Sequence, residues 1–100
     1  MSREPLTRVA REVARLRAEC GLTQARAAAL LNVTSSNVSG VELGTRRLSL
    51  ERVYHWAVVL GGDPRELVEM LLQDRLDARG LEFIVSVEPR AERRLPRRGA

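Results

Sequence analysis

The sequence predicts an all-α domain of five helices that is followed by one short β-strand. Apolar residues recur at spacings of three and four as far as residue 79, which is the helical period, and they alternate with polar residues only over 81–88. Glycines and good capping residues separate the helical stretches. In a chain of 100 residues, we expect one domain at 1–79, a strand at 80–88 and a basic, disordered tail at 89–100.

The first two predicted helices are short and closely spaced. Pro5 suits the first position of a helix over 5–20, and Gly21 suits its end, because glycine readily adopts the left-handed conformation found there. Thr23 is a suitable N-cap for a second helix over 24–31. The alanines of this second helix favour helix formation and allow a neighbouring backbone to approach closely.

The third predicted helix, over 35–43, follows the second after a tight turn. Asn32 lies at the turn, and after glycine asparagine tolerates the left-handed conformation best. Thr34 is the predicted N-cap. We expect Val38 and Val41 to face inward, which leaves the polar residues of this helix on its outer side. Two short helices joined in this way have the geometry that places a helix in the major groove of DNA.

The fourth and fifth predicted helices complete the domain. Ser49 is the expected N-cap of the fourth, whose inner stripe is Leu50, Val53, Trp56, Ala57 and Leu60. Asp63 is the expected N-cap of the fifth, with Pro at the first position and Glu at the third. The apolar residues of the fifth helix form more than one core-facing stripe, so we expect a second surface to cover the surplus.

The alternating pattern over 81–88 is typical of a strand, and no second strand is predicted. A lone strand leaves a row of N–H and C=O groups without partners, so we expect it to pair with its own copy in a two-fold dimer. The residues expected at this dimer interface are Val68, Leu72, Leu76, Leu81, Phe83, Ile84, Val85 and Val87.

Charge is unevenly distributed along the chain. Residues 1–47 contain eight Arg and four Glu, whereas residues 48–88 contain four Arg and eight acidic residues. Residues 89–100 contain five Arg and one Glu. A polyanion such as DNA is therefore attracted to the first and last of these segments and repelled by the middle one.

Several other classes of protein are disfavoured. The sequence has no run of 18 apolar residues and no apolar signal-peptide region near its N-terminus. The single cysteine, Cys20, cannot form an internal disulfide, which fits a reducing cytoplasm. The sequence shows no pairing of a nucleophile with a general base and no residues at the spacing of metal ligands. It also has no Gly-rich phosphate-binding loop. We therefore expect no enzyme activity, cofactor, metal ion or membrane partner.

Four stretches between Leu16 and Leu72 carry a family resemblance. They read RAECGLTQ, ALLNVTSSNVSGVELGTRR, SLERVYHWAVVLG and DPRELV. In these words and their spacing the chain closely resembles the Xre-type, lambda-repressor-like helix-turn-helix family. The resemblance implies a five-helix DNA-binding domain that acts as a dimer on a two-fold operator. The chain departs from the family at Ala27, where Leu is usual, at Asn32, where Gly is usual, and at Gly62, where an apolar residue is common.

The resemblance also implies roles for individual residues. Gln24 matches a phosphate-contacting Gln, and Glu42 matches an acid that pairs with an arginine of the first helix, here Arg17. Arg46 and Arg47 match the basic loop after the recognition helix, although they are alternatively solvated loop charges. The full set expected at the DNA is Thr23, Gln24, Thr34, Ser35, Ser36, Asn37, Ser39, Gly40, Thr45, Arg46 and Arg47.

The expected base-reading positions hold no Arg, Lys or Gln. Asn37 is the best base reader among them, because its amide can bond adenine N6 and N7, whereas serines specify little and are alternatively a solvated face. We therefore expect phosphate contacts and DNA shape to provide much of the affinity.

Together these features predict a sequence-specific, DNA-binding transcription regulator in the cytoplasm. The simplest version is a repressor that binds an inverted repeat of double-stranded DNA as a homodimer. The alternative is an antitoxin, which binds its operator and also a toxin protein through its C-terminal strand and tail.

Overall fold

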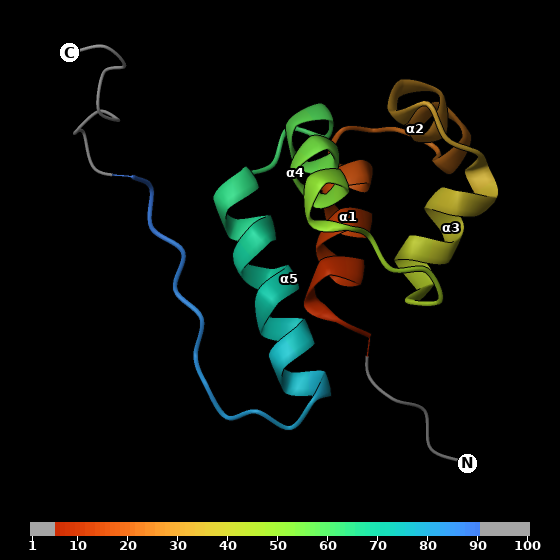
Figure 1. Cartoon of the computed structure of the whole chain (residues 1–100). Coiled ribbons are helices and arrows are strands. Elements are labelled where there is room, and N and C mark those ends of the chain that lie inside the picture. Colours follow the sequence, from red (N-terminus) through yellow and green to blue (C-terminus); the bar gives the residue numbers. More distant parts are fainter. Residues whose placement is uncertain (1–5, 91–100) are drawn as a thin grey trace, which may run out of the picture.

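The computed structural model describes residues 6–90, which form five α-helices and no strand. The helices are α1 (Arg8–Glu19), α2 (Gln24–Leu31), α3 (Ser35–Leu43), α4 (Leu50–Val59) and α5 (Pro64–Ala78). Helix α1 is central and packs against α3 on one side and α5 on the other (Figure 1). Helices α2 and α3 pack together at one end of the molecule, and α4 packs on α5 at the other.

Each helix begins at a side chain that accepts a hydrogen bond from a backbone N–H of the first turn. The predicted caps Thr23, Thr34, Ser49 and Asp63 are confirmed. The predicted start of the first helix was wrong. Thr7 is the cap, because its hydroxyl accepts the N–H of Ala10, so α1 begins three residues after Pro5, which lies outside the described residues.

The core lies where all five helices meet. Its largest fully buried side chains are Trp56, Leu60, Leu67, Val13, Val38 and Val53. The expected inner stripe of α4 is confirmed except at its first residue: Leu50 is 44% exposed, whereas Leu48, before the Ser49 cap, is buried. A hydrophobic residue just before an N-cap often packs against its helix in this way.

Gly62 is a point of close approach between the α4–α5 junction and α1. A Cβ built on Gly62 meets Leu16 Cδ1 at 2.6 Å, a distance too short for any real side chain. The branched side chain of Leu16 therefore occupies the space beside the Gly62 backbone.

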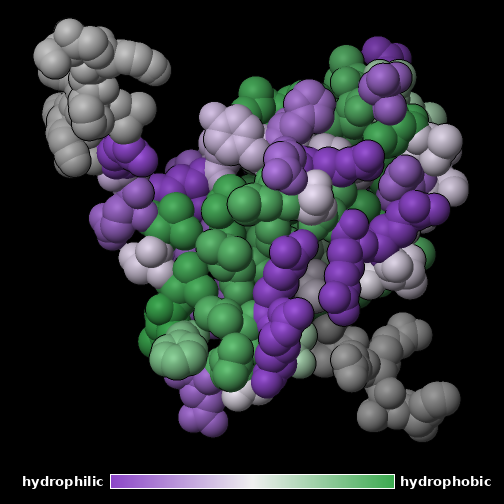
Figure 2. All heavy atoms as spheres, viewed as in Figure 1, coloured by the Kyte–Doolittle hydropathy of each residue, from purple (hydrophilic) through white to green (hydrophobic). Residues whose placement is uncertain are grey.

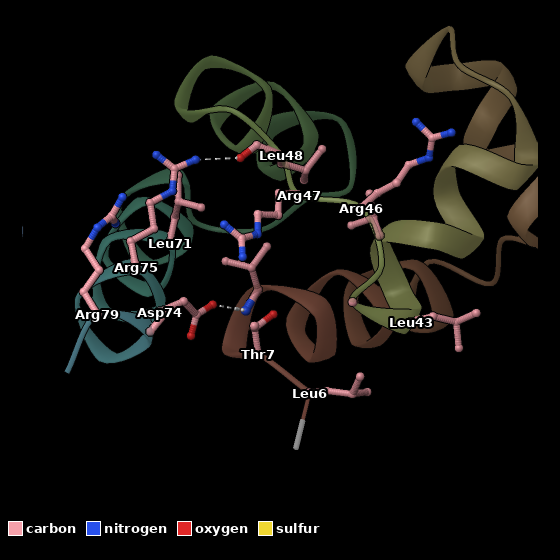
Figure 3. A pocket seen from close by; sticks show the side chains of 14 residues that line it. Leu6, Thr7, Leu43, Arg46, Arg47, Leu48, Leu71, Asp74, Arg75 and Arg79 are labelled. Carbon is pink, nitrogen blue, oxygen red and sulfur yellow. Dashed lines mark hydrogen bonds between the residues drawn. The ribbon is translucent and has the colours of Figure 1, made fainter. Parts of the chain in front are cut away.

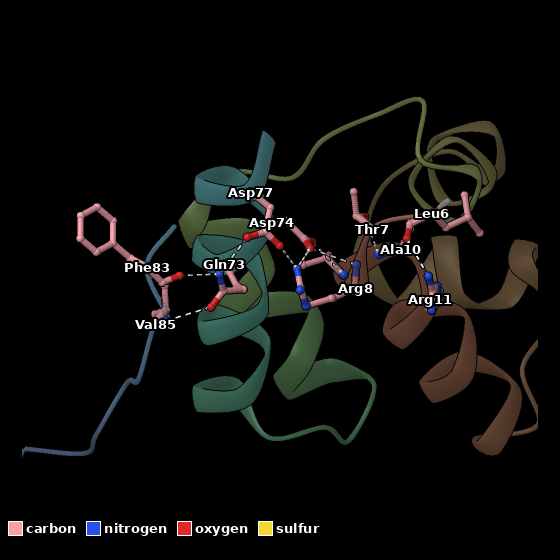
Figure 4. Close-up of polar contacts among 11 residues, drawn as sticks. Leu6, Thr7, Arg8, Ala10, Arg11, Gln73, Asp74, Asp77, Phe83 and Val85 are labelled. Carbon is pink, nitrogen blue, oxygen red and sulfur yellow. Dashed lines mark hydrogen bonds and ion pairs between the residues drawn. The ribbon is translucent and has the colours of Figure 1, made fainter. Parts of the chain in front are cut away.

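The segment 81–88 is not a strand, so that prediction was wrong. It runs along α5, and side chains of α5 hold its backbone (Figures 1 and 4). Gln73 donates through Nε2 to the Phe83 carbonyl at 2.9 Å and accepts the Val85 N–H at 2.8 Å. Glu69 accepts the Val87 N–H at 2.9 Å. The alternating pattern predicts a strand, but the hydrogen bonds to this backbone come from side chains of a helix.

The eight residues expected at a dimer interface are only partly covered in the single chain. Leu81, Phe83 and Ile84 are exposed, and Ile84 retains 92% of its accessible surface. The half-buried members are Val68, Leu72, Leu76, Val85 and Val87. Figure 2 shows hydrophobic residues gathered over α4, α5 and the segment beside them. The predicted tail at 89–100 falls outside the described residues from position 91 onward.

Candidate nucleic-acid interface

The turn between α2 and α3 depends on Asn32. Its backbone is left-handed, with φ 58° and ψ 46°, and it is the sole non-glycine residue with positive φ among residues 6–90. The Val33 N–H then bonds back to the Ala28 carbonyl at 3.0 Å. The turn predicted at Asn32 is therefore confirmed. The buried Ala27 and Ala28 are small, so α2 and α3 can pack closely.

Helix α3 lies with one apolar edge in the core and a polar face outward. Val38 and Val41 are 1% and 2% exposed and anchor the helix. The N-terminal members of the predicted DNA-contacting set, Thr34, Ser35 and Ser36, are exposed. The remaining members on this helix, Asn37, Ser39 and Gly40, are half-buried. The outer face therefore presents short hydroxyl and amide groups and no charged side chain.

A buried ion pair fixes α3 to α1. Arg17 donates to Glu42 through Nε at 2.6 Å and through Nη2 at 2.9 Å, and through Nη1 to the Leu22 carbonyl at 2.8 Å. This geometry agrees with the pairing that the family resemblance implies. Burial raises the pKa of Glu42, but the hydrogen bonds from Arg17 and Gln24 outweigh it and leave that pKa below its ordinary value.

Gln24 belongs to the same network. Its Nε2 donates to Glu42 Oε1 at 3.1 Å, which holds the side chain at the start of α2. The amide is half-buried, and the second N–H of Nε2 makes no hydrogen bond within residues 6–90, so it can still donate. A fixed amide at a helix N-terminus, beside backbone N–H groups, is well placed to bind a phosphate oxygen.

The loop after α3 turns back over the helix. Gly44 is left-handed, with φ 80°, and ends α3. The Gly40 carbonyl then accepts hydrogen bonds from the Thr45 N–H at 2.9 Å, the Arg46 N–H at 3.1 Å and the Thr45 hydroxyl at 3.2 Å. The loop is thus tied to the last turn of the helix that it follows.

The two adjacent loop arginines point in different directions. Figure 3 shows Arg46 extending beside α3, while Arg47 points between α1 and α5. Both arginines line an open pocket of about 500 Å³, in which Arg47 lies on the side of Leu71, Asp74 and Arg75. Sequence reasoning treats the two arginines alike, because their difference depends on the path of the loop in space.

Within the described residues, 6–90, no group of His, Cys, Asp or Glu could hold a metal ion. No helix in that part of the chain is both long enough and apolar enough to cross a lipid bilayer. Cys20 is exposed, and its thiol donates to the Leu60 carbonyl at 3.2 Å.

A family model described as helix-turn-helix matches residues 13–67, which is more than half of the chain and includes both the turn and the recognition helix. The chain belongs to the Xre-type, lambda-repressor-like helix-turn-helix family. This confirms the family predicted from the sequence, and the five predicted helices are present within residues 6–90. A comparison with curated proteins found no significant match.

Solved structures of helix-turn-helix regulators resemble this chain. The restriction-modification controller protein C.AhdI from Aeromonas hydrophila is 36% identical, with a TM-score of 0.56 over 61% of this chain and 88% of C.AhdI. The wild-type controller protein C.Esp1396I is 26% identical, with a TM-score of 0.54 over 68% of this chain and 90% of that one. The clp gene regulator ClgR from C. glutamicum has a TM-score of 0.60 over 74% of this chain and 97% of ClgR. Its sequence is 22% identical, so this similarity concerns the fold alone.

The family and the site together establish the class of activity. The chain is a DNA-binding transcription regulator, and the helix-turn-helix unit implies double-stranded DNA as its partner. Its family and its structural neighbours are regulators and not enzymes.

Proposed function

We propose that this regulator is a repressor that binds an inverted-repeat operator as a homodimer. The observation that carries the proposal is the outward polar face of α3, which is anchored from behind by valines and fixed to α1 by the Arg17–Glu42 pair. A helix held in this way can enter the major groove without rearrangement. Occupation of a promoter by the dimer then blocks polymerase sterically.

The proposed phosphate contacts lie on both sides of that helix. Thr23 and Gln24 stand at the start of α2, and Thr45 stands in the loop after α3. Contacts to phosphates fix the register of the recognition helix on the duplex but carry no sequence information directly. Base contacts then come from Ser36 and Asn37, with the adenine-reading amide of Asn37 as the most selective of this pair.

The homodimer is supported by the apolar surface beside α5. Phe83 and Ile84 are 65% and 92% exposed, and the half-buried Leu72 and Leu76 lie on α5 itself. Exposed large apolar side chains that gather in one region are typical of an interface between proteins. A two-fold dimer through this face presents two recognition helices to half-sites about 34 Å apart, which is one turn of DNA.

Selection of bound fragments from random double-stranded DNA tests the proposal. We expect a consensus made of two inverted half-sites about one helical turn apart, and sedimentation of the same protein should show a dimer. Binding without any enriched sequence contradicts the proposed specificity. A monomer that binds single half-sites contradicts the homodimer, and it favours the alternative in which a different protein, such as a toxin, covers Phe83 and Ile84.

A second candidate concerns the regulated genes. The 36% identity with C.AhdI over 88% of that protein favours control of restriction-modification genes. Gel-shift experiments with DNA from upstream of this gene and of its neighbours test this candidate. It requires that restriction or methyltransferase genes lie beside this one and that their upstream DNA competes with the selected consensus.

A further inference from the structure

The recognition helix lacks a long polar side chain where one is most useful. Its outward positions hold Ser35, Ser36, Asn37, Ser39 and Gly40. The commonest specific contact in the major groove is a bidentate arginine to guanine O6 and N7, and none of these residues can make it. The contacts of Ser36 and Asn37 aside, an arginine contact to guanine would therefore have to come from elsewhere in the fold.

Gly40 leaves space against the backbone of α3 for the side chain of such a residue. A Cβ built on Gly40 meets three carbons of the Arg46 side chain: Cγ at 3.0 Å, Cδ at 3.1 Å and Cβ at 3.4 Å. The aliphatic part of Arg46 thus lies directly on the backbone of α3, in the space that a side chain of residue 40 would take. A Cβ at position 40 would force the Arg46 side chain to shift by a few tenths of an ångström.

The contact is fixed by the backbone as well. The Gly40 carbonyl accepts the N–H groups of Thr45 and Arg46 and also the Thr45 hydroxyl, at 2.9–3.2 Å. These bonds hold residue 46 at a set height along α3. The guanidinium of Arg46 is exposed and has no protein partner within the described part of the chain, so it remains available to bind DNA.

We propose that Arg46 acts as the principal base reader of the recognition helix, on which it lies, and that it binds the O6 and N7 atoms of a guanine in each half-site. This proposal rests on the proposed function, because it presumes that α3 enters the major groove. It assigns Arg46 to sequence readout, whereas a solvated loop arginine contributes only to phosphate binding. Gly40 is then a positioning residue for Arg46, because the absence of a side chain at Gly40 leaves room for the Arg46 side chain.

Selection from random DNA with the wild-type chain and with Arg46→Ala tests the proposal. We expect the wild-type consensus to contain one guanine per half-site whose preference disappears in Arg46→Ala, with discrimination at that base falling about 5- to 150-fold. Arg46→Lys keeps the charge but lacks the planar fork, so it should lose the same guanine preference while it retains most nonspecific affinity.

Gly40→Ala tests the contact between Gly40 and Arg46 without removing any charge. The added Cβ forces the Arg46 side chain to shift by a few tenths of an ångström, so the guanine preference should fall, but by less than in Arg46→Ala. Alanine is also the better helix former, so loss of folding is not expected, and circular dichroism checks this. Arg47→Ala is the charge-matched control, because Arg47 points between α1 and α5 and a phosphate contact made by it carries no sequence information; its loss should lower affinity uniformly and leave the guanine preference unchanged.

The possible failures are distinguishable. If Arg46→Ala selects the wild-type consensus and only loses affinity uniformly, Arg46 is a phosphate contact and this proposal is overturned while the proposed function stands. If the wild-type chain itself enriches no sequence, both are overturned.

Discussion

Glu42 of α3 accepts two hydrogen bonds from Arg17 of α1, from Nε at 2.6 Å and from Nη2 at 2.9 Å. The Glu42 side chain is 8% exposed and that of Arg17 20%, so the pair is largely shielded from water. A shielded, two-point pair fixes both the distance and the rotation of α3 relative to α1. The recognition helix α3 is therefore positioned by Arg17 of α1, which lies outside both α2 and α3.

Replacing Glu42 with Gln should lower the free energy of unfolding by about 1.5–3 kcal/mol at neutral pH, because the charged hydrogen bonds from Arg17 are lost. The effect should depend on pH. Since the pKa of Glu42 is lowered in the folded chain, its stabilising contribution is complete above the ordinary Glu pKa of about 4.3. It is lost as the pH falls through the lower, folded-state pKa.

Urea unfolding of wild type and Glu42→Gln at pH 7, 5 and 3 measures this difference. The difference in stability between the two chains should be smaller at pH 3 than at pH 7. Glu19→Gln is the control, because Glu19 is 61% exposed in its pair with Arg15 and should have little effect at any pH. A wild-type advantage that stays the same from pH 7 to pH 3 contradicts the role assigned to the Glu42 carboxylate.

Replacing Gly62 with Ala should have opposite effects in two backgrounds. In the wild type, the new Cβ meets Leu16 at 2.6 Å within the core and should destabilise the chain by about 1 kcal/mol. In a Leu16→Ala chain the space is open and position 62 has no positive φ, so the same change should stabilise by about 0.4–1 kcal/mol. Denaturant unfolding of the four chains gives both values, and equal effects in the two backgrounds contradict the proposed contact.

Much of the fold could be predicted from local chemistry. The caps Thr23, Thr34, Ser49 and Asp63 and the turn at Asn32 each depend on residues within four positions of one another, and a linear sequence displays such relations directly. The start of α1 was missed because Pro5 and Thr7 both suit a helix N-terminus. Composition alone cannot choose between two acceptable caps.

The features that could not be predicted depend on pairs that are distant in the sequence. The pattern over 81–88 predicts a strand, and it cannot show that Gln73 and Glu69 of α5, rather than another strand, provide the hydrogen bonds. The contact between Arg46 and Gly40 depends on the path of a loop in space. The sequence shows a glycine in a predicted helix close to a loop that contains arginines, but it does not show toward which residue the Arg46 side chain points.

Asp74 of α5 caps the N-terminus of α1 from a distance of 66 residues. Its carboxylate accepts the backbone N–H groups of Arg8 and Val9, each at 3.1 Å, and also the Arg8 guanidinium at 3.0 Å (Figure 4). Replacing Asp74 with Ala should therefore lower the free energy of unfolding by about 1–2 kcal/mol, as the loss of a local cap does. Thermal and urea unfolding measure it.

Asp77→Ala is the matched control for Asp74→Ala. Asp77 also pairs with the Arg8 guanidinium, at 2.8 Å, but its side chain is 47% exposed and it accepts no backbone N–H of α1. Its removal should change stability by less than about 1 kcal/mol. If both variants lose the same stability, the interaction with Arg8 and not the capping of α1 accounts for the role of Asp74.

Replacing Ile84 with Asp should weaken the proposed dimer without unfolding the chain. Ile84 is 92% exposed in the single chain, so the substitution should change the free energy of unfolding of the monomer by no more than about 0.5 kcal/mol. A carboxylate at an apolar interface is costly to desolvate, so sedimentation equilibrium should show a shift toward monomer. Leu30→Asp is the control, because Leu30 is 58% exposed but lies on α2, away from the apolar surface beside α5. A dimer that resists Ile84→Asp yet dissociates in Leu30→Asp places the interface on the α2 side of the molecule, and it removes the two-fold geometry on which the operator spacing depends.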